Sequence, residues 1–167
     1  VVEALMEKVG ISISTWILDR QGLIENGVIV LVGPGHNGCD GLVVARELYL
    51  EGVDVSIWCP FPLNKESTQQ HFDYAMQIGI ENMENNPDPN SDLLWIESLF
   101  GLGQSRIISE EIVDLLHAKK KYTPDKLISV DVPAGLDSDN GNIISKSSCL
   151  ASHTMTVGLF KSGLIQD

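Results

Sequence analysis

The sequence is poor in positive charge. It carries 11 Lys and Arg against 23 Asp and Glu, so its formal net charge is −12 over 167 residues. This balance argues against a protein that binds the phosphate backbone of a nucleic acid, because such affinity comes largely from Lys and Arg. A small anionic ligand is still possible, since backbone N–H groups and one or two cations can bind it.

Long apolar runs and paired cysteines are missing as well. No stretch approaches the ~20 consecutive apolar residues of a membrane-spanning helix, and nothing at the start has the pattern of a signal peptide. Cys39, Cys59 and Cys149 are an odd number without a CxxC pair, which favours a reducing interior over a disulfide framework. We therefore expect a cytoplasmic protein that binds neither nucleic acid nor membrane.

Length and composition predict a single domain. With 43% apolar residues the chain can bury a substantial core, and no repeat, low-complexity tract or linker divides it. The chain begins at Val1 inside an apparent helix and stops soon after an apolar run. We interpret residues 1–167 as one domain, trimmed at both ends and excised from a longer protein.

Apolar segments with helical and strand-like spacing alternate along the chain. Gly10 weakens the middle of the first helix, and Ile80 continues the apolar stripe of the third. Helices are expected at Val1–Arg20, Asp40–Leu50, Lys65–Ile78 and Ser109–Lys120, and strands at Gly27–Val32, Val53–Trp58, Leu93–Ile96, Leu127–Val130 and Thr154–Val157. This order predicts an α/β sandwich with a mainly parallel sheet, whose ligand lies beyond the carboxyl ends of the strands.

The loop after the first strand, Gly33–Gly41, is rich in glycine. Its sequence GPGHNGCDG contains a GxGxxG match between an expected strand and an expected helix. Glycines let a backbone approach a ligand closely, and the N–H groups at a helix start favour a phosphate. Asn37 and Asp40 add side chains that can hydrogen-bond or coordinate a polar ligand. The plainer alternative is a glycine-rich turn with Asp40 as the helix N-cap.

Two other chemistries can be weighed at this loop. A conventional NAD-dependent dehydrogenase places an acid near the end of the second strand to bind the ribose hydroxyls, but here Asp54 lies at the start of that strand and its end has no acid. His36 and Cys39 would suit a thiol nucleophile at a helix N-terminus. No orienting acid lies nearby in the sequence, so we expect Cys39 to be a packing substitution.

Two later loops carry candidate groups. Glu97 falls at the end of the third strand, and the loop behind it carries Arg106, which either covers a ligand or pairs with surface carboxylates. Asp131 follows the fourth strand, where it could serve as a general acid or base or cap the adjacent turn. Lys161 either approaches the same crevice or faces solvent.

No metal site follows from residue spacing. The segment Asp137–Gly141 imitates the start of a calcium loop but lacks the glycine at its sixth position and the acid at its twelfth, which favours a turn. His71, His117 and His153 do not have the spacing of zinc ligands.

Taken together, these motifs resemble the NAD(P)H-hydrate epimerase family, which forms the N-terminal half of bacterial bifunctional NAD(P)H-hydrate repair enzymes. The resemblance runs over essentially the whole chain and implies a Rossmann-like three-layer α/β/α sandwich. The matching segments are Leu5–Gly10 (family LMExAG), Gly33–Gly41 (GPGNNGGDG), Glu97–Gly101 (DAIFG), Ser129–Gly135 (SVDIPSG) and Thr154–Leu164 (TVTFGxxKxGL).

The resemblance implies an isomerase that interconverts the R and S epimers of hydrated NADH or NADPH (NADHX, NADPHX) at C6. A fused or partner ATP- or ADP-dependent dehydratase would then restore the cofactor, and the family's frequent dimers suggest a homodimer. Asp131 would be the catalytic residue, because exchange of the C6 hydroxyl needs acid/base help. The implied substrate-binding residues are His36, Asn37, Gly38, Cys39, Asp40, Gly101, Leu102, Gly103, Gln104, Ser105, Arg106, Ile107 and Asp131.

The resemblance also implies a potassium ion, at positions that correspond to Asn37, Glu97 and Ala134. Glu97 replaces an Asp and is longer by one methylene, and Ala134 removes a Ser hydroxyl. We therefore expect a potassium site that is weak or absent.

Two more substitutions fall in the substrate loop, where His36 replaces an Asn and Cys39 replaces a Gly. Asp40 and Asp131 keep the family's residues. A second hypothesis is therefore a catalytically degraded domain of the same fold, which binds a nucleotide or supports dimerisation.

Overall fold

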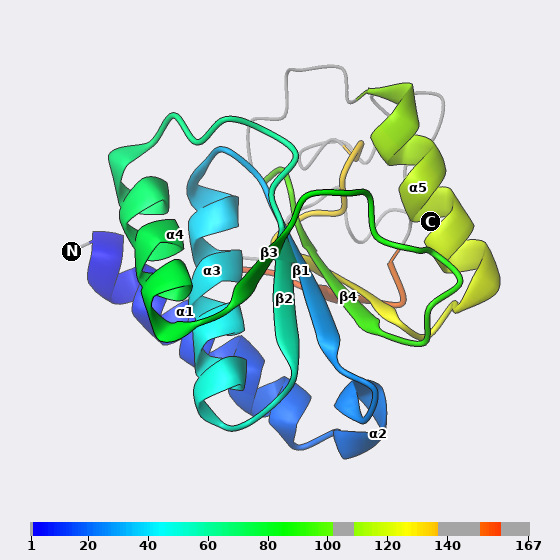
Figure 1. The fold of residues 1–167 in the computed structure, drawn as a ribbon, viewed down its shortest axis with the longest axis horizontal. Helices are drawn as coiled ribbons and strands as arrows, with labels where there is room; N and C mark the ends of the chain where they lie inside the picture. The colour runs from blue at the N-terminus through cyan, green and yellow to red at the C-terminus, as the bar shows by residue number, and fades with distance from the viewer. Residues whose placement is uncertain (1, 102–108, 137–150, 158–167) are drawn as a thin grey trace.

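A computed structural model describes residues 2–101, 109–136 and 151–157. Within these residues, six parallel strands form one sheet with helices on both faces (Figure 1). The elements in chain order are α1 (Val2–Leu18), α2 (Gln21–Ile24), β1 (Val28–Val32), α3 (His36–Leu50), β2 (Val55–Trp58), α4 (Glu66–Ile78), β3 (Glu81–Met83), β4 (Leu94–Ser98), α5 (Glu110–Tyr122), β5 (Leu127–Val130) and β6 (His153–Met155).

The strand order in the sheet is β3-β2-β1-β4-β5-β6, and each neighbouring pair is parallel. The chain winds outward from β1 to β3, returns to the middle at β4, and winds outward again on the other side. The loops after β1 and β4 therefore diverge, which is where doubly wound sheets open a crevice for a ligand. The predicted α/β sandwich with a parallel sheet is confirmed.

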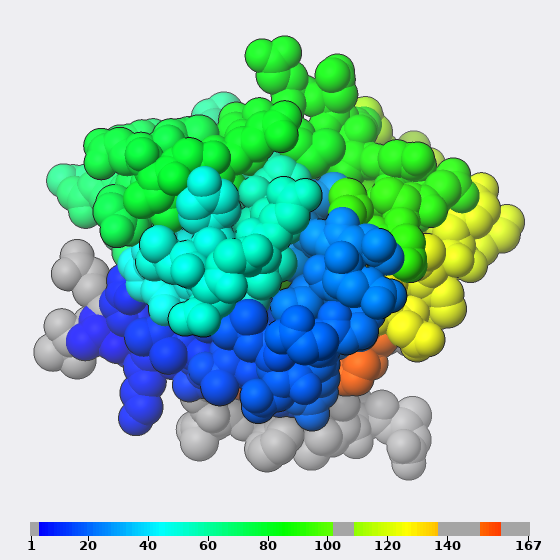
Figure 2. Space-filling view, turned by 60° about the horizontal axis from the view of Figure 1, so that its bottom comes forward, coloured from blue at the N-terminus to red at the C-terminus, as the bar shows by residue number. Residues whose placement is uncertain are grey.

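The sheet is buried on both faces, as its apolar strands predict. Helices α1, α3 and α4 cover one face and α5 covers the other, so that α1 and α5 lie on opposite sides of the molecule (Figures 1 and 2). Alternate residues of β1 divide between the two cores. Val28, Val30 and Val32 pack with residues of α1 and α3, whereas Ile29 and Leu31 pack with residues of α5.

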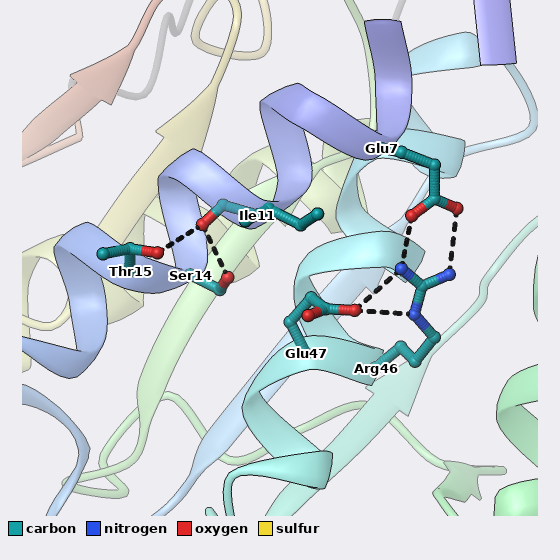
Figure 3. A network of polar contacts seen from close by, with 6 residues as sticks. All are labelled: Glu7, Ile11, Ser14, Thr15, Arg46 and Glu47. Carbon is teal, nitrogen blue, oxygen red and sulfur yellow. Dashed lines mark hydrogen bonds and ion pairs between the residues drawn. The ribbon is translucent and has the colours of Figure 1, made fainter. Parts of the chain in front are cut away.

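Helix α1 packs closely on α3. A Cβ on Gly10 would overlap the side chain of Val43, so the glycine that weakens α1 locally lets the two helices approach. Nearby, Arg46 of α3 forms a bidentate ion pair with Glu7 of α1 and also donates to Glu47 (Figure 3). This ion pair anchors α1 to α3, the helix that follows the glycine-rich loop.

Several element boundaries differ from those predicted. Helix α3 begins at His36 rather than Asp40, so the residues after Gly35 are already helical. Helix α4 ends at Ile78 because Gly79 takes a left-handed φ of 101°, and Ile80 packs in the core from beyond the helix. The short helix α2 and the edge strand β3 were not predicted, and the residues of β3 are exposed or half-buried.

The other predicted elements are confirmed to within two residues at most ends, and β6 begins one residue earlier than expected. Among the described residues, no helix has the length and apolar character needed to cross a membrane.

The contact between α1 and α3 can be tested at Gly10. We expect Gly10→Ala to lower the free energy of unfolding by about 1–2 kcal/mol, because overlap with Val43 outweighs the gain in helix propensity. Urea unfolding measures this change. Gly22→Ala is the matched control, since no atom lies within 4 Å of a Cβ added there. Equal stability of the two variants would contradict the close packing of α1 on α3.

Candidate active site

Glycines after β1 bring the start of α3 against the end of β4. A Cβ on Gly33 would overlap the carbonyl oxygen of Leu99, and a Cβ on Gly41 would overlap the hydroxyl of Ser98. A Cβ on Gly38 would overlap the carbonyl oxygen of Gly33 itself. At these three positions the space beside the glycine Cα is therefore filled by the chain itself, which explains the glycines by close packing.

Helix α3 has Gly35 as its N-cap, carries Asn37 in its first turn, and carries Asp40 at the start of its second turn. The alternative of Asp40 as the N-cap is wrong, and the helix begins without a side-chain cap. No atom lies within 4 Å of a Cβ added at Gly35, so the loop is open at this point. Thr68 of α4 is fully buried and donates its hydroxyl to the carbonyl of Gly35 at 3.1 Å. This hydrogen bond holds the loop after β1 against α4.

Three loops converge at Gly101. A Cβ added to Gly101 would lie 3.2 Å from both Cβ of Asn37 and Oδ2 of Asp131. Asn37 donates its amide to the carbonyl of Phe100 at 2.5 Å and to the carbonyl of Val130 at 3.0 Å. Its buried Oδ1 has no hydrogen-bond partner among the described residues. Asn37 therefore joins the segments that follow β1, β4 and β5.

Asp131 has a special backbone conformation directly after β5. Its φ of 68° lies in the left-handed region, which Asp tolerates better than most residues but which still stores strain. Its N–H donates to the carbonyl of Met155 at 2.8 Å, and its Oδ1 accepts from the N–H of Val157 at 3.3 Å. The β6 segment thus fixes both the backbone and the carboxyl group of Asp131.

Asp40 is buried close to Asp131. Burial, and after it the negative charge of Asp131, raises the pKa of Asp40 from 3.8 to about 7. Its Oδ1 has no hydrogen-bond partner within the described part of the chain. The two carboxyl groups therefore form a pair in which Asp40 can hold a proton near neutral pH, the arrangement that general acid/base chemistry uses.

Glu97 is 1% exposed and lies between two loops of the site. Its Oε1 accepts from the N–H of Leu99 at 3.0 Å, and its Oε2 accepts from the hydroxyl of Ser129 at 2.8 Å and from the N–H of Ala134 at 3.2 Å. Burial raises the pKa of Glu97 to about 7, although these hydrogen bonds act in the opposite direction.

These contacts test the positions implied for potassium. Both carboxyl oxygens of Glu97 already accept hydrogen bonds, and Ala134 contributes no side-chain oxygen. The amide of Asn37 donates to two backbone carbonyls, which occupies oxygen atoms that a cation would need. Of the oxygens at these positions only the buried Oδ1 of Asn37 has no hydrogen-bond partner among the described residues, and one such atom is too few to coordinate the ion, so the three positions do not fit potassium as they are arranged.

The remaining predicted substrate residues are placed differently. His36 is exposed at the start of α3, and Gly38 is buried. Cys39 is fully buried, so its thiol faces the interior, in keeping with a packing substitution. Leu102–Ile107, with Arg106, lie outside the described residues, as do Asp137–Gly141 and Lys161.

No metal cluster appears in the part of the chain that the structure describes, where no three His, Cys, Asp or Glu side chains come together to hold an ion. His71 and His117 lie on helices α4 and α5. The ring of His153 packs against Trp16, with 5.2 Å between centroids.

Sequence reasoning missed the small polar residues that support the site. Thr68, Ser98 and Ser129 are buried and each donates a hydroxyl, Ser98 to the carbonyl of Leu31 at 2.7 Å. For Ser98 and Ser129 the available indication is a polar residue inside an apolar run, because buried polar groups are almost always hydrogen-bonded. Thr68 lies among polar residues and has no such indication.

Lys119 is a further buried polar residue, but it lies at the other end of β4, away from the site. Its ammonium group donates to the carbonyls of Ser91 and Leu93 at 2.7 and 2.8 Å. Burial lowers its pKa to about 8. These two hydrogen bonds join α5 to the residues that directly precede β4.

The sequence matches the family described as YjeF-related protein N-terminus over residues 2–163. The chain belongs to this family. The bifunctional NAD(P)H-hydrate repair enzyme Nnr of Gloeobacter violaceus is 40% identical to this YjeF-related domain over 169 residues, which cover 99% of this chain and 33% of that protein. The NAD(P)H-hydrate epimerase of Oenococcus oeni is 32% identical over 165 residues, covering 98% of this chain and 78% of that protein.

A solved structure supports the fold of the YjeF-related domain. The crystal structure of yeast ynu0, YNL200c, superposes with a TM-score of 0.77 at 25% identity, and covers 92% of this chain and 70% of that chain. The Rossmann-like sandwich and the family resemblance are both confirmed. The domain spans about a third of the length of the bifunctional relatives it matches.

The raised pKa of Asp40 predicts a pH dependence of stability for the YjeF-related domain. Between its unfolded pKa of 3.8 and its folded pKa of about 7, Asp40 keeps a proton that the unfolded chain has lost. This contribution to stability is complete below the unfolded value and disappears as pH rises through the folded value. We expect Asp40→Asn to reduce the loss of unfolding free energy between about pH 5 and about pH 8 by about 1–3 kcal/mol.

Urea unfolding across this pH range measures the effect. Glu97 titrates in the same window but is unchanged in both proteins, so it cancels in the comparison. Asp54→Asn, at an exposed position, serves as the control and should keep the wild-type profile. If Asp40→Asn also keeps the wild-type profile, that result contradicts the claim that folded Asp40 holds a proton up to about pH 7.

Proposed function

We propose that this chain is an epimerase domain that interconverts the R and S forms of hydrated NADH and NADPH at C6, as part of nicotinamide nucleotide repair. The observation that carries the proposal is the gathering of Asn37, Asp40, Gly101 and Asp131 where the sheet reverses its winding, in a chain of the YjeF-related family. Relatives named NAD(P)H-hydrate epimerase, of which the chain covers about three quarters, support the reaction.

Asp131 is the proposed acid/base group. Exchange of the C6 hydroxyl delivers a proton to the leaving hydroxyl and removes one from the attacking water. Ring opening instead removes the proton of the C6 hydroxyl and delivers one to the ring nitrogen as the C6–N bond breaks. A positioned carboxyl group can transfer the protons of either route. One oxygen of Asp131 is held by the N–H of Val157, and the other lies toward Gly101. Asp40, with its pKa raised to about 7, supplies a neighbouring carboxyl that can hold a proton at neutral pH.

The start of α3 is the proposed contact for the nucleotide. The loop is open at Gly35 and the helix begins without a side-chain cap, so backbone N–H groups of its first turn can meet an anionic group. His36, Asn37 and Asp40 belong to the proposed substrate set through their side chains. Gly38 and Cys39 belong to it through their backbone, because the Cys39 side chain is buried.

The remaining contacts are proposed from the resemblance alone. Gly101 begins the loop that would embrace the nucleotide, and Leu102, Gly103, Gln104, Ser105, Arg106 and Ile107 continue it. Arg106 would supply the cation that offsets the acidic chain near a phosphate. Potassium has no part in the proposed reaction, because the residues at its positions do not fit it.

The bifunctional relatives support a proposal about the complete protein. We infer that a dehydratase domain accompanies this one, because proteins named bifunctional NAD(P)H-hydrate repair enzyme match it over about a third of their length. A homodimer and a cytoplasmic location are proposed on the resemblance.

The acid/base role can be tested with Asp131→Asn. Asn has nearly the same shape and tolerates the left-handed backbone, so the fold should persist. We expect the catalysed interconversion to slow by about 100-fold or more. Chromatography of each purified epimer of NADHX and NADPHX, with the spontaneous rate subtracted, measures the reaction.

Asp54→Asn again supplies the control and should keep the wild-type rate. A wild-type protein that does not accelerate epimerisation would overturn the proposed function, and nucleotide binding without turnover would instead favour a degraded domain. Equal rates for the two variants would overturn the role of Asp131 alone.

A further inference from the structure

Glu97 connects the segments that carry the site. It lies on β4 opposite Ser129 of β5 in the parallel register, and its carboxyl group accepts the Ser129 hydroxyl. The same carboxyl accepts the N–H of Leu99, at the start of the loop after β4. It also accepts the N–H of Ala134, which follows Asp131 by three residues. One buried side chain therefore ties the loop after β4 to both flanks of Asp131.

Glu97 links these loops as a bridging cation would, but it is a carboxyl group that gathers hydrogen-bond donors, whereas a cation gathers oxygen atoms. Here backbone N–H groups, among them those of Leu99 and Ala134, and the hydroxyl of Ser129 point at the carboxyl of Glu97. The nearby carbonyls of Phe100 and Val130 are gathered by the amide of Asn37. The hydrogen bonds of Glu97 and Asn37 thus join directly the loops that a cation would otherwise bridge.

The extra methylene of Glu97 and the lost hydroxyl at Ala134 both favour hydrogen bonds from the protein to the Glu97 carboxyl over a bound cation. The longer side chain lets the carboxyl reach the backbone N–H of Ala134 as well as the hydroxyl of Ser129. Alanine at position 134 contributes no competing side-chain oxygen. The two substitutions are therefore explained together by one internal network.

We propose that Glu97 is a positioning residue that replaces a bridging potassium ion, holding the Asp131 segment against the loop after β4 by hydrogen bonds. The site then works without potassium. The catalytic part of this inference rests on the proposed function, whereas its structural part can be measured without turnover.

The first experiment compares salts. Epimerisation by the wild-type protein should change by less than about twofold when potassium chloride is replaced by choline chloride at equal ionic strength. Its melting temperature should differ by less than about 1 °C between these salts. A fall in rate of about tenfold or more without potassium, together with a potassium-specific rise in melting temperature, would overturn the inference.

The second experiment changes the carboxyl to an amide. Glu97→Gln keeps the size of the side chain but turns one acceptor oxygen into a donor that faces other donors. We expect the melting temperature to fall by about 5 °C or more and the rate to fall by about tenfold or more, in either salt. Glu111→Gln is the matched control, because Glu111 is an exposed carboxyl that accepts one hydrogen bond from Asn86, and it should have neither effect. A Glu97→Gln protein that matches the control would overturn the positioning role.

The third experiment restores the family's residues. Glu97→Asp combined with Ala134→Ser should gain a potassium-specific rise in melting temperature of about 2 °C or more, and its rate should become higher in potassium than in choline. A merely structural role for Glu97 predicts no such cation specificity. If the double variant does not fold, the salt comparison on the wild-type protein decides the inference.

The two levels of failure are distinguishable. A wild-type protein that is inactive in every salt overturns the proposed function. The melting temperatures alone then test whether Glu97 takes the place of potassium. An active protein that needs potassium leaves the proposed function intact and overturns the inference.

Discussion

The site depends on how closely the backbone after β1 approaches the backbone after β4. Gly33 leaves room for the carbonyl of Leu99, and Gly41 leaves room for the hydroxyl of Ser98. Any side chain at these positions would push α3 away from the end of β4. Because the approach occurs where the sheet reverses its winding, it aims the first turn of α3 at the loops after β4 and β5. The proximity of Asp40 and Asp131 is a consequence of this packing.

Three buried carboxyl groups meet the same problem of desolvation in three different ways. Glu97 is surrounded by N–H and O–H donors, although burial still raises its pKa to about 7. Asp131 accepts from the β6 segment, and Oδ1 of Asp40 has no hydrogen-bond partner among the described residues. A carboxyl that is saturated with donors is suited to hold other groups in place. A carboxyl that lacks them is suited to exchange a proton. The division of labour within the site follows from the hydrogen-bond partners of each group.

Much of the fold could be predicted from the sequence because the central strands are continuous apolar runs between helical segments. The edge strand β3 escaped prediction, since its residues are mostly exposed and have no apolar pattern. The start of α3 was misplaced because its N-cap is Gly35, which offers no side chain to mark the boundary.

The candidate site was predictable in its members but only partly in its geometry. Asp40 and Asp131 stand in loops that directly follow strands, and strand order alone brings such loops together. A sequence does not show whether the space beside a glycine faces a ligand or the chain itself, so the close packing of Gly33 on Leu99 could not be predicted. The partners of Thr68 and Ser129 are more than thirty residues away in the chain, which no local pattern reveals.

The orientation of the Asp131 carboxyl depends on the edge strand β6 and the residues that follow it, although none of these residues takes part in the proposed chemistry. Met155 accepts the N–H of Asp131, and Val157 donates to its carboxyl group. In the described sheet β6 has a neighbour on one side only, and such margins open more readily than central strands. Local fraying there would release the strained backbone of Asp131, together with the contacts of Met155 and Val157 at the edge of one core. The edge of the sheet can therefore set how long the carboxyl of Asp131 keeps its orientation.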